Sequence, residues 1–453
     1  MDRLMVGVSG VRGTVGQTLT PQVACEFGLA FGRLLGKGKK VVIGRDTRPS
    51  GPMVRSAVAA GLLASGVHVT DLGVVSTPGA ALMTARMGAG GGVVVTASHN
   101  PIQYNGIKFL QPTGTGLTAA SAAQLKAIWQ EAKWDLAGPT EQGEEDRNGQ
   151  TPGFHVNAVC GVVDVIAIAN ERFKVVLDSV NGAGCVEAPT LLGKLGCECK
   201  HLNGEATGRF AHPPEPVQEN LRELCDAVVK HRAAVGFAQD ADADRLAIVD
   251  ENGVFIGEEY TLALAAAFVL RKRKGKLATN LATSRMVDDI AAAAGCEVVR
   301  SPTGEANVVE AMRREGCIFG GEGGGGVIEP RVVPVRDSLV GMAYLLQQMA
   351  ETGKTVSQLV AEIPRYVMIK TKQACPESAV GPIFEATRAA FASEPGATFN
   401  DQDGLRIDLP QAWVSVRASN TEPIIRIMGE ARDRARIEAL VARVQAIANS
   451  VIS

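Results

Sequence analysis

The sequence has no Cys-x-x-Cys pair and no hydrophobic run long enough to span a bilayer. Its nine cysteines are scattered, with Cys197 and Cys199 the closest two, which excludes a disulfide framework or zinc site and favours buried thiols in a reducing compartment. Apolar stretches such as 260–270 are far shorter than the roughly 20 residues of a transmembrane helix, and no signal-like N-terminus is present. We therefore expect a soluble, cytoplasmic protein that does not bind membranes.

An excess of charge of one sign is also missing. The 46 basic and 48 acidic side chains leave a formal net charge of -2, so no overall field favours nucleic acid or an acidic membrane as a partner. The basic cluster 271–274 follows an apolar run and is typical of cations at a helix C-terminus. A small molecule is the partner that these observations favour.

A chain of 453 residues is too long for one ordinary core and predicts three or four domains. Strands and helices alternate in the first hundred residues, as they do in a parallel α/β sheet. The expected strands are 41–44, 67–72 and 93–95, and the expected helices are 20–35, 53–65 and 78–87.

The same alternation recurs twice, which indicates an internal repeat of one α/β unit. The second cycle is expected to contain a helix near 216–230, and the third strand of the third cycle is expected at 317–319. In each cycle the third strand ends in an unusual loop, at 96–101, 240–245 and 320–326. Ligands of open α/β sheets bind at the carboxyl ends of strands, so we expect these loops to face one central cleft. The fold class is therefore α/β, with three similar domains that have largely parallel sheets and a smaller C-terminal α+β domain. The predicted domains are 1–153, 154–255, 256–364 and 365–453, with a surface connection at 138–153.

The first loop, 96–101, follows the apolar run 92–95 and places Ser98 and His99 at the end of a buried strand. Helix capping and an Asn-Pro turn are one interpretation of these residues, and an exposed catalytic loop is the other. A Ser-His hydrolase is disfavoured, because neighbouring side chains of an extended chain point to opposite faces and no Gly-x-Ser-x-Gly surrounds Ser98.

The second loop carries Asp240, Asp242 and Asp244, whose alternation in an extended chain would place three carboxylates on one side. Oxygen ligands alone favour a hard cation such as Mg²⁺. An EF-hand is a rival interpretation, because Glu251 stands at the twelfth position, but Arg245 occupies the sixth position, where that loop needs glycine. A solvated acidic loop without metal is the remaining alternative.

Two further stretches carry binding chemistry. Residues 417–423 place hydroxyls, an amide and Arg417 between two predicted strands, the second of which contains Arg426, and together they suit a phosphate group. A plain hairpin turn is the alternative. In the third loop, Glu322 stands among glycines and could accept hydrogen bonds from sugar hydroxyls, although a flexible tight turn has the same composition.

Together these stretches resemble the α-D-phosphohexomutase superfamily, which interconverts hexose 1-phosphates and 6-phosphates. The resemblance rests on five motifs in order along the whole chain: 10–13, 96–101, 240–245, 321–322 and 417–423. It implies a phosphoserine at Ser98 and one Mg²⁺ held by Asp240, Asp242 and Asp244 together with Ser98. It also implies sugar contact by Glu322, phosphate binding by Arg417, Ser419, Asn420 and Thr421, and positions around the transferred phosphoryl group for Arg12, His99, Lys108 and Arg245.

The resemblance further implies a hexose 1,6-bisphosphate as intermediate and activator, with His99 or Lys108 taking the proton of the sugar hydroxyl. The glycines 323–326 and the start at 9–13 are similar to archaeal-type phosphoglucosamine mutases, whereas Asn420 is similar to phosphomannomutases and phosphoglucomutases. We therefore expect glucosamine phosphate as substrate, with mannose or glucose phosphate as the alternative. A phosphatase and a non-catalytic phosphosugar- or Ca²⁺-binding module are rivals of other classes, and the protein is expected to be a monomer or homodimer.

Overall fold

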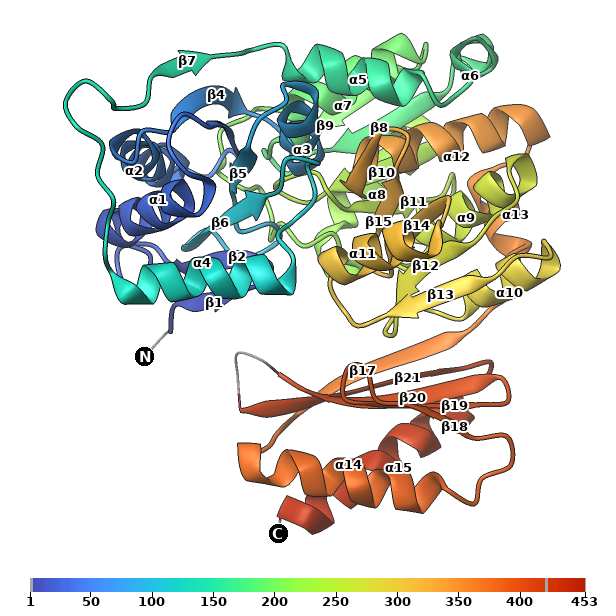
Figure 1. Ribbon diagram of the computed structural model, residues 1–453. Helices are drawn as coiled ribbons and strands as arrows, with labels where there is room; N and C mark the ends of the chain where they lie inside the picture. Colours follow the sequence, from blue (N-terminus) through green and yellow to red (C-terminus); the bar gives the residue numbers. More distant parts are fainter. Residues whose placement is uncertain (1–2, 420–422, 453) are drawn as a thin grey trace.

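The computed structural model describes residues 3–419 and 423–452 and contains four β-sheets, one for each domain along the chain (Figure 1). Three of the sheets are mixed and largely parallel, and the fourth is antiparallel. This arrangement confirms the predicted fold class of three α/β domains and a smaller α+β domain.

The first sheet has seven strands in the order β1-β2-β6-β5-β3-β4-β7. Its centre is the parallel set β3, β4 and β5, and β6 returns antiparallel to β5. The strands are β1 (Met5–Gly7), β2 (Gly10–Thr14), β3 (Lys40–Arg45), β4 (His68–Val74), β5 (Gly91–Val95), β6 (Tyr104–Leu110) and β7 (Glu145–Arg147). The helices are α1 (Pro21–Leu35), α2 (Gly51–Ala64), α3 (Thr77–Arg86) and α4 (Ala119–Glu131).

The second and third sheets repeat this plan. The second comprises β8 (Lys174–Asp178), β9 (Glu198–Leu202), β10 (Val235–Gln239) and β11 (Leu246–Val249). The third comprises β12 (Leu277–Asn280), β13 (Val298–Ser301), β14 (Phe319–Glu322), β15 (Gly326–Glu329) and β16 (Val333–Arg336). Their helices are α5 (Thr151–Cys160), α6 (Val165–Glu171), α7 (Gly184–Lys194), α8 (Arg222–His231), α9 (Tyr260–Lys272), α10 (Met286–Ala293), α11 (Glu305–Glu315), α12 (Ser338–Thr352) and α13 (Val356–Ala361), with a 3₁₀ turn at Gln218–Asn220.

The three sheets share one strand order, which demonstrates the internal repeat. The orders are β6-β5-β3-β4, β11-β10-β8-β9 and β15-β14-β12-β13. In each, the strand before the antiparallel return (β5, β10 or β14) carries one of the three unusual loops at its carboxyl end. The repeat therefore places the three loops at equivalent positions of equivalent sheets.

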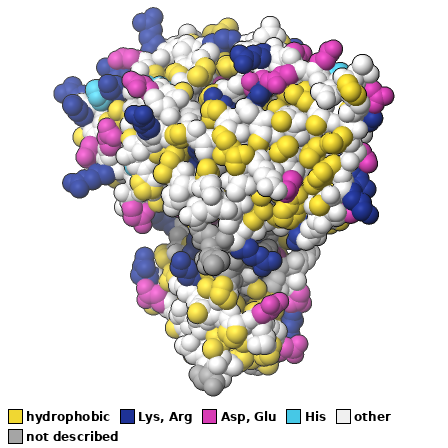
Figure 2. Space-filling model, turned by 90° about the vertical axis from the view of Figure 1, so that its left-hand side faces the viewer, with side chains coloured by type: hydrophobic (Ala, Val, Ile, Leu, Met, Phe, Trp, Pro, Cys, Tyr) yellow, Lys and Arg dark blue, Asp and Glu magenta, His cyan; other side chains and the backbone are white. Residues whose placement is uncertain are grey.

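The first three domains share a continuous hydrophobic core, whereas the fourth has its own. One cluster of buried side chains extends from β3 to Ile363, and the almost wholly buried helix α12 packs within it against α5, α6 and α9. The fourth domain consists of β17 (Val367–Ala374), β18 (Thr398–Asn400), β19 (Leu405–Leu409), β20 (Ala412–Ala418), β21 (Ile424–Ala431), α14 (Glu377–Phe391) and α15 (Arg434–Ile452), around a separate cluster. It forms a distinct lobe in the space-filling view (Figure 2).

Several expected elements differ from the structure. The segment 138–153, expected as a surface connection only, carries β7, which pairs in parallel with β4. The helix expected from about Pro216 begins at Arg222, because the prolines in 213–216 favour extended and turn conformations. The third strand of the third repeat is 319–322 instead of 317–319.

The structure bears on two expectations from the sequence, the state of the cysteines and the absence of a membrane-spanning helix. All nine cysteines lie in the described part of the chain, and all are free thiols, none of them exposed. No single described helix has both the length and the apolar composition to cross a membrane. Among the described helices, α5 and α6 reach that length and composition only when counted together, and they are bent by 91° relative to one another.

A fully buried histidine connects the first three domains. His155 of α5 lies with Nδ1 3.2 Å from Glu187 Oε2 of α7 and with Nε2 2.7 Å from Asp337 Oδ2 at the start of α12. The other oxygen of Glu187 accepts a hydrogen bond from the Ser76 amide, just before α3. Burial alone would lower the pKa of His155, but Asp337 and Glu187 outweigh burial and raise the pKa to about 10.

We expect His155→Gln to destabilise the protein by about 3 to 5 kcal/mol, because two buried carboxylates lose their cation. The folded-state pKa of His155 lies above the unfolded value, so this stabilisation is complete below about pH 6.5 and disappears as the pH rises towards 10. Urea midpoints of both proteins between pH 6 and 10 measure the effect. The exposed His231→Gln is the control, and equal midpoints for wild type and His155→Gln at pH 6 would contradict the expectation.

Candidate active site

A cavity of about 910 Å³ lies where all four domains meet. Eight of the predicted site residues line it: Arg12, Ser98, His99, Lys108, Arg245, Glu322, Arg417 and Arg426. Of the other predicted residues, the three aspartates lie directly behind Ser98, and Ser419 follows β20. Asn420 and Thr421 lie outside the described residues.

Ser98 is buried, with only 4% of its surface exposed, and is held in an unusual backbone conformation. Its φ of 50° is in the left-handed region that non-glycine residues rarely adopt. The hydroxyl donates to Asp240 Oδ2 at 2.7 Å and lies 3.3 Å from His99 Nδ1. The amide of Ser98 donates to Thr96 Oγ1, so the strand-ending loop is a tight turn that aims a hydroxyl at the aspartates.

A buried arginine outside the predicted site fixes this loop. Arg48 has no exposed surface and donates to the backbone carbonyls of four loop residues at 2.5 to 2.9 Å. The four carbonyls belong to Ser98, Asn100, Pro101 and Tyr104. Its Nε donates to Asp46 Oδ2, which also accepts from the Thr96 hydroxyl. The guanidinium thus satisfies carbonyls that would otherwise be unpaired inside the protein.

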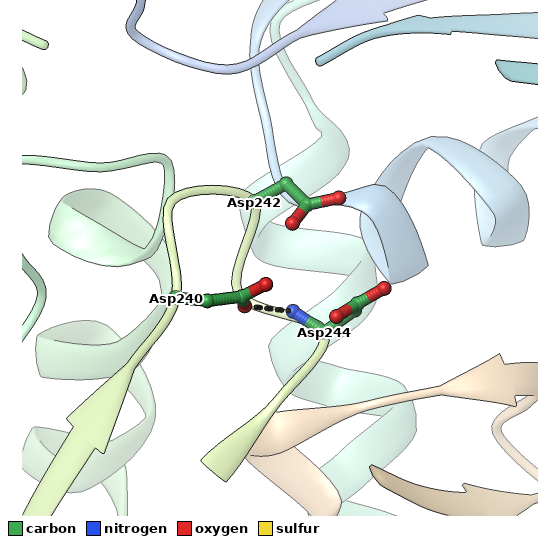
Figure 3. A group of neighbouring side chains, drawn as sticks. All are labelled: Asp240, Asp242 and Asp244. Atoms are coloured by element: carbon green, nitrogen blue, oxygen red, sulfur yellow. Dashed lines mark hydrogen bonds between the residues drawn. The ribbon is translucent and has the colours of Figure 1, made fainter. Parts of the chain in front are cut away.

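The three aspartates converge, as expected, but through a turn instead of an extended chain (Figure 3). One carboxylate oxygen from each lies within 4.8 Å of those of the other two. Asp240 Oδ1 accepts from the amides of Asp244 and Arg245, and Ala243 has a φ of 56°, so the loop curls around the first carboxylate. The predicted cluster of carboxylates exists, but a curled loop produces it, and the predicted alternation of side chains along an extended chain was wrong.

The charges of the triad are unequal. Burial, with repulsion by Asp244 and Asp242, raises the pKa of Asp240 well above its ordinary value. Burial would do the same for Asp242 and Asp244, but Lys108 lowers the pKa of Asp242, and Arg336 with Lys108 lowers that of Asp244. Two ionised carboxylates therefore stand beside one that favours a proton, an arrangement that a cation would relieve.

The triad fits a divalent metal ion. Asp242 Oδ1 and Asp244 Oδ1 are buried and have no hydrogen-bond donor in the described part of the chain. Carboxylate oxygens are the ligands that Mg²⁺ prefers. The EF-hand interpretation fails, because Glu251 is bound to the amide and hydroxyl of Ser357 and because 246–249 form strand β11.

Lys108 and His99 hold opposite protonation states. Lys108 Nζ lies 2.7 Å from Asp242 Oδ2 and 3.4 Å from Asp244 Oδ2, and although burial opposes it, this pairing raises the pKa of Lys108. Burial, together with Arg245 and Arg12, lowers the pKa of His99 to about 3. Lys108 is therefore a charged donor here, and His99 is neutral with a lone pair available.

Arg12 of β2 and Arg245 after the aspartate loop add positive charge to the same end of the cavity. Both act on the pKa of His99, which places them near the Ser98 loop. Across residues 3–419 and 423–452, neither forms a salt bridge. Two guanidinium groups without carboxylate partners are suited to an anion.

Glu322 ends β14 with both carboxylate oxygens engaged. Oε1 accepts from Asn280 Nδ2 at 2.7 Å and from the Gly304 amide at 3.1 Å, and Oε2 accepts from Arg336 Nη1 at 2.9 Å. Only 5% of Glu322 is exposed, but it lines the cavity. Its orientation is therefore set by neighbours from three other segments of the third domain.

The fourth domain presents a row of cations to the cavity. Lys372 of β17 and Arg417 of β20 are each paired in register with Arg426 of β21, the strand between them. Like charges directly opposite one another destabilise a sheet. Of these three cations, only Arg417 has a salt bridge with a described residue, at 2.8 Å to Asp403 Oδ2, which also accepts from the Thr303 amide of the third domain. The row is therefore suited to a phosphate group.

Three residues that contact the site, Arg48, Arg336 and Asp403, were not predicted from the sequence. The stretch 45–49 follows a predicted strand just as the Ser98 loop does, and that equivalence was a usable signal for Arg48. Asp403-Gly404 reads as a turn, and Gly404 is indeed in one, with a φ of 79°. Nothing local distinguishes Arg336 from other arginines at strand ends.

The chain matches four consecutive domains of one family. Residues 3–135, 154–253 and 257–366 match phosphoglucomutase/phosphomannomutase alpha/beta/alpha domains I, II and III, and residues 371–447 match its C-terminal domain. The domain order is that of the family, and the matches cover most of the chain.

Individual relatives extend over nearly the full length. The chain is 40% identical to a phosphoglucomutase/phosphomannomutase of Thermococcus kodakarensis, with 94% of each chain covered. It is 38% identical to a probable phosphoglucosamine mutase of Methanopyrus kandleri, with 96% of this chain and 95% of that protein covered. A crystal structure of a phosphoglucomutase/phosphomannomutase family protein from Burkholderia thailandensis superposes with a TM-score of 0.84 at 29% identity, over 99% of this chain and 97% of that chain.

We expect Arg48→Lys to loosen the Ser98 loop, because an ammonium has three donors and cannot reach four carbonyls and Asp46 together. Each hydrogen bond to a charged group contributes about 1.5 to 3 kcal/mol. Amide exchange of residues 97–104 should become at least tenfold faster, and the melting temperature should fall. Arg147→Lys on the exposed strand β7 is the control, and unchanged exchange in Arg48→Lys would refute the assigned role.

Proposed function

We propose that this chain, which belongs to the phosphoglucomutase/phosphomannomutase family of the α-D-phosphohexomutase superfamily, interconverts glucosamine 6-phosphate and glucosamine 1-phosphate through a phosphoserine at Ser98. Family membership makes it an isomerase of hexose phosphates. The proposal adds the covalent carrier, the roles of the residues and the sugar.

The observation that carries the proposal is the position of Ser98. Its hydroxyl is buried at the end of the cavity, bonded to the aspartate loop at 2.7 Å, with Arg12 and Arg245 near the adjacent His99. A phosphoryl group on Oγ brings a charge of about -1.5 to -2, which the two unpaired arginines are placed to balance. Stored as a phosphoserine, this group is a phosphoryl donor instead of a simple nucleophile.

In the proposed reaction the Oγ–P bond of Ser98 breaks as the phosphorus bonds to a sugar hydroxyl. The product is a hexose 1,6-bisphosphate, which reorients and returns its other phosphoryl group to Ser98. The attacking hydroxyl must lose its proton, and we assign it to His99, whose Nδ1 lies 3.3 Å from Ser98 Oγ. The negative charge of a phosphoryl group on Ser98 would raise the pKa of His99 from its low value and make it a better base. Lys108, held in its charged state by Asp242, instead donates to the phosphoryl oxygens.

Asp240, Asp242 and Asp244, with an oxygen of the Ser98 group, would hold the Mg²⁺ ion. The bound ion would neutralise charge on the phosphoryl group as it is transferred. At the opposite side of the cavity, Arg417 and Arg426, with Ser419, Asn420 and Thr421, would bind the phosphate group that is not being transferred.

The sugar assignment rests on the acidic character of the third domain. Four carboxylates of the third repeat line the cavity, Glu258, Glu259, Glu305 and Glu322, and within the described residues they share two salt-bridge cations, Lys370 and Arg336, so negative charge is in excess. Glucosamine carries an ammonium group at neutral pH, which carboxylates bind strongly, whereas glucose and mannose carry none. The name of the Methanopyrus kandleri relative supports the same sugar, and that of the more similar Thermococcus kodakarensis relative supports glucose and mannose phosphates as the alternative.

We expect the purified protein, with Mg²⁺ and a catalytic amount of hexose 1,6-bisphosphate, to convert glucosamine 6-phosphate with a higher kcat/KM than mannose, glucose or N-acetylglucosamine 6-phosphate. A preference of tenfold or more is expected from one buried charge contact. Rates for the four substrates and the release of inorganic phosphate are measured side by side.

Each rival has its own outcome in this experiment. A faster rate with mannose or glucose phosphate would overturn the sugar assignment and keep the mutase. No turnover of any hexose phosphate would leave a binding module, and free phosphate without isomer would identify a phosphatase. Removal of the metal with a chelator, followed by Mg²⁺, should abolish and then restore the rate.

We also expect freshly purified protein to carry one phosphoryl group, located at Ser98 by peptide mapping, and Ser98→Ala to lose at least a thousandfold in rate. Thr96→Ser, which keeps the hydroxyl bonded to the Ser98 amide, is a matched control within the same loop. A phosphoryl group elsewhere, together with a fully active Ser98→Ala, would exclude the carrier.

A further inference from the structure

Arg336, the last residue of β16, contacts carboxylates from three different segments. Its Nη2 donates to Asp244 Oδ2 at 2.7 Å, its Nη1 donates to Glu322 Oε2 at 2.9 Å, and its Nε lies 3.0 Å from Glu305 Oε2. The first two are hydrogen bonds, and the third is an ion pair without hydrogen-bond geometry. The side chain is 15% exposed and forms part of the cavity wall.

Arg336 contacts residues of two different binding sites, one for the metal and one for the sugar. Asp244 is in the aspartate triad that fits the metal, and Glu322 is the carboxylate placed to meet the sugar. A guanidinium is planar and rigid, so a shift that keeps one of these bonds changes the geometry of the other. Asp244 and Glu322 are almost fully buried, so water cannot readily replace either bond.

A glycine on the neighbouring strand makes room for this side chain. A Cβ atom at Gly326 of β15 would lie 2.3 Å from Arg336 Cδ and 2.9 Å from its Cγ. Any side chain there would displace Arg336 from its present path. The absence of a side chain at Gly326 thus allows the Arg336 guanidinium to lie between the two carboxylates.

We propose that Arg336 is a positioning residue that couples the sugar-binding carboxylate Glu322 to the metal-site carboxylate Asp244. The proposal rests on the proposed function for the identity of the two ligands. Among the described residues, Asp244 without Arg336 keeps only the Lys108 ammonium, at 3.4 Å. Glu322 Oε2 loses its donor, while Oε1 keeps Asn280 and the Gly304 amide. Both sites should therefore weaken together.

The test uses two variants that leave the net charge of the protein unchanged, so that a change in the electrostatic potential of the whole protein cannot explain the result. Arg336→Lys retains one cation but cannot bridge the carboxylates, and Gly326→Ala displaces an intact arginine. Both are made in the full-length chain with Ser98 intact and free of a phosphoryl group, so that no phosphoryl donor is present, and Mg²⁺ and glucosamine 6-phosphate are titrated separately by calorimetry. We expect each variant to bind both ligands about tenfold more weakly, as for other residues that orient metal ligands.

Controls separate positioning from general destabilisation. Asn280→Ala should weaken the sugar phosphate alone, because Asn280 contacts Glu322 and not Asp244. Gly193→Ala, where a Cβ meets nothing within 4 Å, should change neither affinity. The Arg336→Lys/Gly326→Ala double variant should bind no more weakly than Arg336→Lys alone, because both changes remove the same contact.

Two results would overturn the proposal: Mg²⁺ affinity within twofold of the parent in both variants, or additive losses in the double variant with a lowered melting temperature. Failure of the proposed function gives a different result. In that case the parent itself binds Mg²⁺ but no hexose phosphate, and the link between Arg336 and Asp244 is still decided by the Mg²⁺ titration.

Discussion

Buried carboxylates need cations, and this requirement governs how the first three domains are assembled. The aspartate loop of the second domain is balanced by Lys108 from the first and by Arg336 from the third. On the other side of the same domains, His155 balances Glu187 and Asp337. Because Lys108 and Arg336 each pair with an aspartate of another domain, and Asp337 pairs with a histidine of another domain, these charges are satisfied only when the domains are docked. The continuous hydrophobic core and the active-site charges thus require the same arrangement.

The fourth domain follows a different principle. It has its own core, and its contacts with the third domain are polar, centred on buried Glu430, which accepts from the Ser284 hydroxyl and the Arg285 amide. On its cavity face Lys372, Arg417 and Arg426 lie in one row, and among the described residues the one salt bridge of this row joins Arg417 to Asp403. Within the described residues, positive charge is therefore in excess on this face, as it is at Arg12 and Arg245, whereas the aspartate loop and His155 have partners of opposite charge inside the protein.

The sequence predicted the parts of the site that depend on local pattern. Each buried strand and the polar loop that ends it can be recognised within about ten residues, so Ser98, the three aspartates and Glu322 were found, and the repeat placed their loops in one cleft. The residues that hold this machinery were not found, because their partners are distant in the chain. Arg48 is 50 residues from Ser98, and Arg336 is 92 residues from Asp244. The curl of the aspartate loop was also missed, since nothing in the sequence indicates that Ala243 adopts a positive φ.

The four carbonyl bonds from Arg48 keep the backbone of the Ser98 loop in one place. If Ser98 carries the phosphoryl group as proposed, a ligand that exchanges phosphoryl groups with it at both of its ends must bind in two opposite orientations within the same 910 Å³. Every side chain that recognises the sugar then meets a different hydroxyl in each orientation. Such a cleft recognises the overall shape of the phosphosugar, which is similar in both orientations, more than the configuration at any single carbon. Tolerance of sugars that differ at one carbon is therefore a geometric consequence of the fixed position of Ser98.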